Sequence, residues 1–338
     1  MRNPRLSKDL EGQLKQKFKG MIAYGESRND ATEEERKTKI YSKTTYNNYI
    51  KHFRYFIDWL KKNHPEIKRL KKARKFVVEY LKYRDNNPDL SANTLYLDRA
   101  ALNKFYQIEP GDKYYVELKE RKRSEIKRSR GPAVRDKNFS ERNNWELVCF
   151  CRGTGLRRSE IENLKGNECK SYEELIQRKK ELQNKPNKTK QENKELKAIY
   201  DTLEYLPKFE YYVFVANGKG GRVRYSPIIG SNQQQIVERI KNTPENKKVW
   251  EYVSTNADIH SYRSDYATQI YKDFARNIED IPYDKINKGT GKKYQSEVYH
   301  CRNEEKGKKL DKKAMLISSK ALGHNRISII ATNYLRNL

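Results

Sequence analysis

Basic side chains dominate this chain of 338 residues, in which 73 Lys and Arg stand against 45 Asp and Glu and give a formal net charge of +28. A chain with 35% charged residues stays unfolded unless it also has enough bulky apolar surface to bury. The 25 Tyr, 10 Phe and 3 Trp supply that surface. The composition therefore predicts folded domains with basic surfaces.

The charge excess also indicates the class of partner. A strongly cationic surface attracts a polyanion and releases its counterions, so we expect nucleic acid. An anionic membrane surface is the competing interpretation, but the sequence has no apolar run of spanning length, no signal peptide and no lipidation motif. We therefore expect a cytoplasmic, nucleoid-associated protein without a cofactor. Its four cysteines lack the spacing of metal ligands, so we expect them to be reduced structural thiols.

Apolar side chains recur every three or four residues in three stretches of 38–112. This period is typical of amphipathic helices and predicts a small all-helical domain there. The first stretch follows Tyr41, the second spans 73–83, and the third begins after Ser91. Residues 1–37 are polar, and we expect only a basic tail with a short helix in them.

Residues 113–137 are rich in Lys and Arg and contain a Gly-Pro break at 131–132, which is typical of a linker. Such a segment either lies along a phosphate backbone or is simply solvated, and the composition favours neither. If it binds DNA, the candidate contacts are Lys122, Arg123, Lys127 and Arg128.

The remaining residues, 138–338, predict a second domain of mixed structure. Ser140 is a candidate cap for its first helix. Two β-rich runs on either side of the glycine-rich 217–221 predict a hairpin. The insertion at 168–206, rich in Lys, Glu, Gln and Asn with spaced leucines, predicts a helical hairpin, and the polar 280–311 predicts long loops. The fold class is therefore mainly α with a small β-hairpin or sheet (α+β).

Six polar side chains scattered through this second domain fit the needs of one reaction. Direct attack on a DNA phosphorus requires a nucleophile, cationic donors for the nonbridging oxygens and an acid for the leaving oxygen. In chain order the candidates are Arg157, Lys219, His260, Arg263, His324 and Tyr334. No compact cluster of carboxylates indicates a two-metal nuclease, so we expect chemistry without a metal ion.

Tyr334 is the candidate nucleophile, and Ser328 is expected to cap the helix that carries it. An arginine suits the phosphate clamp because its planar guanidinium binds two oxygens at once. Residue type alone does not separate Arg157 from Arg158. Glu160 lies one helical turn beyond Arg157, where its carboxylate can hold the guanidinium.

His260 and Arg263 share one helix face at a spacing of three residues. Although a lone histidine is more often structural, this pairing favours Arg263 as a second clamp and His260 as a group that transfers a proton or binds an oxygen. His324, after Gly323, is expected to hydrogen-bond the phosphate, with a helix-capping role as its alternative.

The glycine-rich turn carries the candidate acid. Lys219, at the tip of the predicted hairpin, is expected to protonate the departing 5′ oxygen of the cut strand. A loop lysine is more often only solvated, so this assignment depends on the motifs around it. Arg222 and Arg224, just after the turn, are alternative phosphate contacts.

Taken in order, these motifs resemble the tyrosine recombinase (phage integrase) family. The resemblance is carried by TGLRRSEI at 154–161, GKGGR at 218–222, HSYR at 260–263, LGH at 322–324, and Tyr334. In that family the residue after Thr-Gly-Leu is the active-site arginine, which favours Arg157 over Arg158.

The resemblance implies a helical core-binding domain and a catalytic domain that close around double-stranded DNA as a C-shaped clamp. It further implies strand exchange through a 3′-phosphotyrosine and a Holliday junction, without ATP. The expected assembly is a homotetramer on two DNA sites that is monomeric when free. A mobile-element integrase and a Xer-like resolvase both fit.

Two other classes of protein share parts of this pattern. A type IB topoisomerase uses similar chemistry, and a non-catalytic sequence-specific DNA-binding protein retains the basic surface. The separate helical domain and the interval between 322–324 and Tyr334 favour a recombinase. A membrane-surface or RNA-binding basic protein is the least favoured class. The insertion at 168–206 exceeds the family's usual length and is a candidate contact with DNA or a neighbouring protomer.

Overall fold

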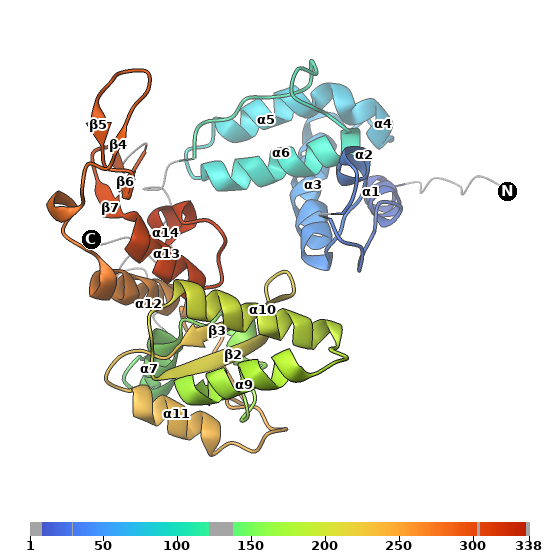
Figure 1. Ribbon diagram of the computed structural model, residues 1–338. Coiled ribbons are helices and arrows are strands. Elements are labelled where there is room, and N and C mark those ends of the chain that lie inside the picture. Colours follow the sequence, from blue (N-terminus) through green and yellow to red (C-terminus); the bar gives the residue numbers. More distant parts are fainter. Residues whose placement is uncertain (1–8, 29, 122–137, 303–304, 336–338) are drawn as a thin grey trace. The chain divides into compact units, whose positions relative to one another are not determined.

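A computed structural model describes residues 9–28, 30–121, 138–302 and 305–335 (Figure 1). Contacts between residues divide the chain into two compact units, 1–126 and 127–338, each of which is described by itself. The linker candidates for DNA contact, Lys122, Arg123, Lys127 and Arg128, lie outside the described residues.

The described part of the first unit is helical (Figure 1). The helices predicted from the apolar period are α3, α5 and α6, although α5 begins later than expected because 74–76 form a 3-10 turn. The side chain of Ser42 caps α3 by accepting a hydrogen bond from the Thr45 amide (3.1 Å). The elements are α1 Leu10–Lys19, α2 Glu33–Thr38, α3 Lys43–Asn63, α4 Leu70–Ala73, η1 Arg74–Phe76, α5 Val77–Asp85 and α6 Ala92–Tyr106.

Aromatic side chains form the centre of this unit. Phe53 of α3 contacts Phe18 of α1 edge-on, with ring centroids 6.1 Å apart, and Phe105 of α6 at 4.4 Å. All three rings are buried. The high aromatic content therefore supplies the core of this helical unit, as the composition predicts.

One buried carboxylate joins three helices of the same unit. Asp98 of α6 is fully buried and contacts Nδ1 of His52 in α3 at 2.7 Å and Nε of Arg84 in α5 at 3.0 Å. A buried charge is stable only when it is paired and hydrogen-bonded. Asp98 therefore fixes the packing of α3, α5 and α6.

Asp98→Ala should lower the free energy of unfolding of this unit by about 3 kcal/mol, because it leaves Arg84 without its buried partner. Urea unfolding followed by circular dichroism measures the change. Asp89→Ala removes an exposed carboxylate from the loop before α6 and should have little effect. Equal losses in the two variants would contradict this role for Asp98.

The second unit surrounds a small antiparallel sheet of order β1-β2-β3 with helices (Figure 1). The predicted hairpin is β2–β3, in which Phe214 lies opposite Tyr225 and the pairing shifts between Val215 and Gly218. The elements up to α12 are α7 Trp145–Thr154, α8 Arg158–Ile161, β1 Cys169–Ser171, α9 Tyr172–Asn184, α10 Lys190–Tyr205, β2 Tyr211–Gly218, β3 Arg222–Pro227, α11 Gln233–Lys241 and α12 Ile259–Phe274.

The insertion at 168–206 contains the helical hairpin predicted from its sequence, α9 and α10, interrupted at Pro186. The prediction of long loops at 280–311 is corrected by the structure. Described residues there pair into two short antiparallel ribbons, β4–β5 and β6–β7. The remaining elements are η3 Ile278–Asp280, β4 Lys285–Ile286, β5 Lys293–Tyr294, β6 Val298–His300, β7 Lys309–Asp311, α13 Lys312–Ala321 and α14 Ser328–Asn333.

Two predicted helix caps are wrong. Helix α7 begins at Trp145 with Asn144 as its cap, because Ser140 instead accepts the amide of Asn143 in a preceding turn. Helix α14 already includes Ser328 as its first residue and is preceded by Ile327, so no side chain caps it.

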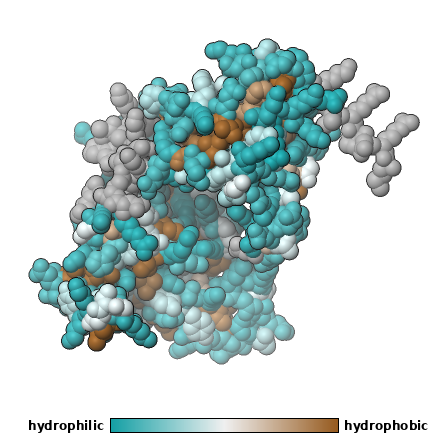
Figure 2. All heavy atoms as spheres, turned by 90° about the horizontal axis from the view of Figure 1, so that it is seen from above, coloured by the Kyte–Doolittle hydropathy of each residue, from teal (hydrophilic) through white to brown (hydrophobic). Residues whose placement is uncertain are grey.

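Helices dominate both units and the sheets are small, as expected for a mainly α fold. Hydrophilic side chains predominate on the face shown in Figure 2, with hydrophobic ones in scattered areas. Across the described residues, no helix combines the length and apolar character that crossing a bilayer requires.

Candidate active site

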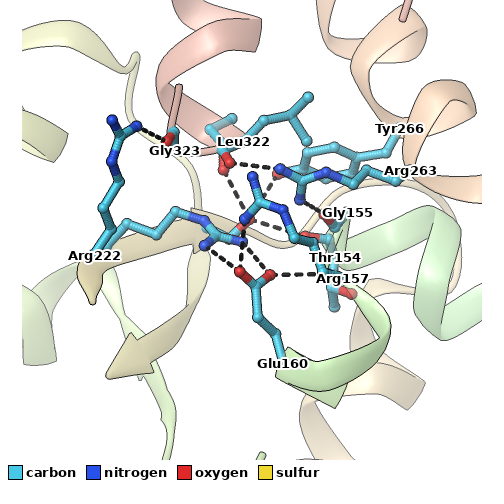
Figure 3. Close-up of polar contacts among 12 residues, drawn as sticks. Thr154, Gly155, Arg157, Glu160, Arg222, Arg263, Tyr266, Leu322 and Gly323 are labelled. Carbon is cyan, nitrogen blue, oxygen red and sulfur yellow. Dashed lines mark hydrogen bonds and ion pairs between the residues drawn. The ribbon is translucent and has the colours of Figure 1, made fainter. Parts of the chain in front are cut away.

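A buried carboxylate, Glu160, holds two arginines in the second unit (Figure 3). Its Oε1 accepts Nη1 of Arg157 at 2.7 Å and Nη1 of Arg224 at 3.0 Å, and its Oε2 accepts Nη2 of Arg224 at 2.7 Å. Burial alone would raise the pKa of the Glu160 carboxyl. The hydrogen bonds and charge of Arg224, with help from Arg263 and the Arg157 amide, outweigh burial and hold that pKa well below its usual range.

The backbone turn between α7 and α8 positions the Glu160 carboxylate. Helix α7 ends at Gly155, whose φ of 61° favours glycine, and a Cβ there would lie 2.2 Å from the Tyr266 ring. The chain then turns, and Arg157 precedes α8 as its cap residue. The Glu160 carboxylate accepts the Arg157 amide at 2.8 Å, so one side chain both caps α8 and orients the guanidinium.

Arg263 of α12 is the most buried cation of the site, with 1% of its surface exposed. Its guanidinium donates to the carbonyl of Gly155, to the carbonyl of Leu322 at 2.6 Å and, through Nε, to the hydroxyl of Tyr334 at 3.3 Å. Burial, followed by the charge of Arg224, lowers the Arg263 pKa to about 10, so the group stays charged near neutral pH.

Tyr334 follows α14 and is 4% exposed, but its hydroxyl lies among polar groups. Besides Arg263, the hydroxyl contacts Nε2 of His324 at 3.1 Å, and the His260 ring centroid lies 5.5 Å from that of Tyr334. The Tyr334 carbonyl accepts the hydroxyl of Ser264 at 2.6 Å, which ties the end of α14 to α12. The phenol is therefore fixed in position beside an arginine and two histidines.

His324 is neutral in this environment. Burial, followed by the charges of Arg263, Arg157, Arg224 and Arg222, lowers its pKa to about 3. In the tautomer that carries its proton on Nδ1, Nε2 accepts the hydrogen of the Tyr334 hydroxyl. The site thus places an unprotonated imidazole next to the candidate nucleophile.

Comparison with known protein families identifies the first unit. Residues 35–109 match the family model of the phage integrase N-terminal SAM-like domain. This part of the chain is therefore similar to a phage integrase N-terminal domain. The match supports the resemblance to the tyrosine recombinase family, and it ends before the residues around Tyr334. No curated protein matches the chain.

The structure brings together five of the six predicted catalytic residues. Arg157, His260, Arg263 and His324 surround Tyr334 or lie within electrostatic range of its partners. The sixth, Lys219, is exposed in the turn between β2 and β3, and no contact with this group of side chains is seen among the described residues.

The structure distinguishes Arg157 from Arg158. The guanidinium of Arg158 donates to backbone carbonyls of the loop before α12, including Ser254 at 2.7 Å and Ala257 at 2.8 Å. It therefore holds a loop, whereas Arg157 pairs with Glu160 (Figure 3) and its charge acts on Arg263 and His324.

The two arginines predicted as alternative phosphate contacts differ in their surroundings. Arg224 is 6% exposed, and its two terminal guanidinium nitrogens pair with Glu160. Arg222 is exposed and donates to the Gly323 carbonyl at 2.8 Å, so it remains a candidate contact. Sequence reasoning missed the Arg224–Glu160 pair because the two residues are 64 positions apart.

The described residues contain no group of three or more His, Cys, Asp and Glu side chains placed as metal ligands would be. No cysteine among the described residues forms a disulfide bond, and burial raises the pKa of Cys151 and of Cys169 to about 12. These two thiols are therefore unreactive core residues.

Glu160→Gln should lower the free energy of unfolding of the second unit by about 3 kcal/mol, because Arg224 would remain buried without a counter-charge. Urea unfolding tests this directly. The matched control is Glu162→Gln, whose half-exposed carboxylate lies 3.9 Å from Arg158. A glutamine at 160 that is as well tolerated as one at 162 would show that the carboxylate does not hold the site together.

The low pKa of His324 predicts an acid-sensitive fold. Below the ordinary histidine pKa of 6.5 the unfolded chain binds a proton at this position, whereas the folded chain does not until about pH 3, so folding loses stability as pH falls. Between about pH 7 and pH 5, the unfolding free energy of His324→Asn should therefore fall less steeply than that of the wild type. If the unfolding free energies of the two proteins fall equally steeply with pH, the pKa of His324 is not lowered by folding.

Proposed function

We propose that this protein is a site-specific DNA strand transferase that cuts and rejoins double-stranded DNA through a covalent bond between Tyr334 and a 3′ phosphate. The observation that carries this proposal is the hydrogen bonding of one phenol to both Arg263 and a neutral His324. The integrase domain at 35–109 supports a DNA substrate.

In the proposed cleavage step, the Tyr334 oxygen attacks phosphorus and its proton passes to Nε2 of His324. The bond from phosphorus to the 5′ oxygen breaks, and Lys219 protonates that oxygen. Reversal of the same step by a 5′ hydroxyl rejoins DNA. Because the phosphotyrosine conserves the energy of the phosphodiester, neither ATP nor hydrolysis is required.

The two arginines have different tasks in this scheme. Arg157 is partly exposed and is held from behind by Glu160, so its free guanidinium edge can bind nonbridging phosphate oxygens. Arg263 is fully engaged with two carbonyls and the phenol, and it orients and polarises the Tyr334 oxygen. His260, on the exposed side of α12, is the further candidate for binding a phosphate oxygen.

At the level of the whole protein, the family resemblance supports a clamp formed by the two units around DNA. It also supports a homotetramer that exchanges strands between two DNA sites through a Holliday junction. The biological role is then that of a mobile-element integrase or a Xer-like resolvase.

The proposal predicts a covalent protein–DNA adduct that depends on Tyr334. Duplexes captured by the protein from a random pool are nicked near the site, incubated in EDTA to silence contaminating nucleases, and analysed on denaturing gels. Wild type should give the adduct and Tyr334→Phe should give none, because phenylalanine has no attacking oxygen. Tyr252→Phe, at a tyrosine that is 71% exposed, is the control and should retain it.

Persistence of the adduct in Tyr334→Phe would assign the nucleophile elsewhere. Tight binding of the captured duplexes without any adduct would favour a non-catalytic DNA-binding protein. Relaxation of plasmids that lack the captured sequence would favour a type IB topoisomerase.

A further inference from the structure

A pocket of about 270 Å³ lies next to the candidate active site and is formed in part by the insertion. Helix α10 forms one wall, β3 forms a second, and the turn between α13 and α14 forms a third. His324 belongs both to this pocket and to the group around Tyr334. The residues that give the pocket its charge are Lys194, Lys197, Asp201, Arg222, Arg224 and Lys320.

Positive charge in this pocket is largely uncompensated. Within the described part of the chain, Lys194, Lys197 and Lys320 form no ion pair with a carboxylate, and Asp201 is the one acidic residue among the lining residues. Lys320 lies over the Tyr205 ring, with Nζ 3.9 Å from its centroid. Cations held close together without counter-charges repel one another, and a bound anion relieves that repulsion.

The insertion is firmly attached where it provides these lysines. Glu195 of α10 accepts the Tyr225 hydroxyl of β3 at 2.9 Å and also pairs with Arg178 of α9 at 3.0 Å. Ile199 of α10 is buried in the same core as Tyr334. Lys194 and Lys197 are three residues apart on this anchored helix, so they lie on the same side of it.

A second observation points to an anion. Arg224 lines the pocket and is 6% exposed, but its buried Nε has no hydrogen-bond partner among the described residues. Buried polar groups in native proteins almost always have partners, so this donor calls for an acceptor from outside the fold. The other guanidinium nitrogens of Arg224 are already bound to Glu160.

We propose that this pocket binds a backbone phosphate of DNA next to the phosphate attacked by Tyr334, which makes the insertion part of the DNA-binding surface. This inference rests on the proposed function. The shared wall at His324 places the bound phosphate on the same strand region as the cut. Lys194 and Lys197 then hold the strand on one side of the break while Tyr334 holds the other.

The test compares two double variants of the full-length protein on a labelled mixed-sequence duplex over a range of salt concentrations. Lys194→Gln with Lys197→Gln removes two pocket charges, and Lys180→Gln with Lys190→Gln removes two exposed charges of the same insertion outside the pocket. Only the pocket variant should bind about tenfold more weakly, with a salt slope smaller by about 1 to 2. Equal weakening in both variants would overturn the proposal.

Further measurements separate the possible causes of a loss. The pocket variant should melt at the same temperature as wild type or higher without DNA, since like charges have been removed, and replacing both lysines by arginine should restore affinity. A lower melting temperature in the glutamine variant without rescue by arginine would mean that the lysines act only in folding.

Two additional experiments separate binding of a DNA phosphate from binding of a free anion, and this inference from the proposed function. In the first, inorganic phosphate is added to each protein without DNA. If phosphate stabilises the wild type but not the pocket variant, and both bind DNA equally tightly, the pocket binds a free anion. Adduct formation by wild type together with unchanged DNA affinity in the pocket variant would overturn this inference and leave the proposed function intact. If the pocket variant binds DNA more weakly but the wild type forms no adduct, the pocket binds DNA and the proposed function is overturned.

Discussion

The second unit depends on the ion pair between Glu160 and Arg224. One buried carboxylate joins α8 to β3, and the same carboxylate orients Arg157. Without it, the guanidinium groups of Arg157, Arg224 and Arg263 would lie within electrostatic range of one another without a counter-charge, which charge repulsion makes costly. The concentration of positive charge that phosphate chemistry needs is therefore possible only because a single negative charge lies at its centre.

The same arrangement explains the character of His324 and Tyr334. Burial, together with the charges of several arginines, keeps the His324 imidazole unprotonated, and a neutral imidazole can accept the proton of a neighbouring phenol. A phosphate entering the site would partly cancel the arginine charges and make proton uptake by His324 easier at the moment of attack. In the proposed reaction, substrate binding and activation of Tyr334 would thus be coupled through electrostatics, without a conformational change.

The sequence was informative where the signal was local. The apolar period around Phe53 indicated α3, and the glycine-rich 217–221 indicated the β2–β3 hairpin. Long-range pairing was not predictable in this way, since nothing near Arg224 in sequence shows that Glu160 would neutralise it. For the same reason residue type alone could not decide between Arg157 and Arg158, whose different contacts depend on a loop near residue 254.

Attachment of Tyr334 to α12 has a consequence for any assembly that the protein forms. The Ser264 hydroxyl holds the Tyr334 backbone against the helix that carries Arg263, and both belong to one folded unit. In the proposed reaction, each copy of the chain would therefore present Tyr334 in cis, beside its own arginines. In the proposed tetramer, no subunit would have to borrow a tyrosine from its neighbour, and the contacts between subunits would be left to control when each site acts.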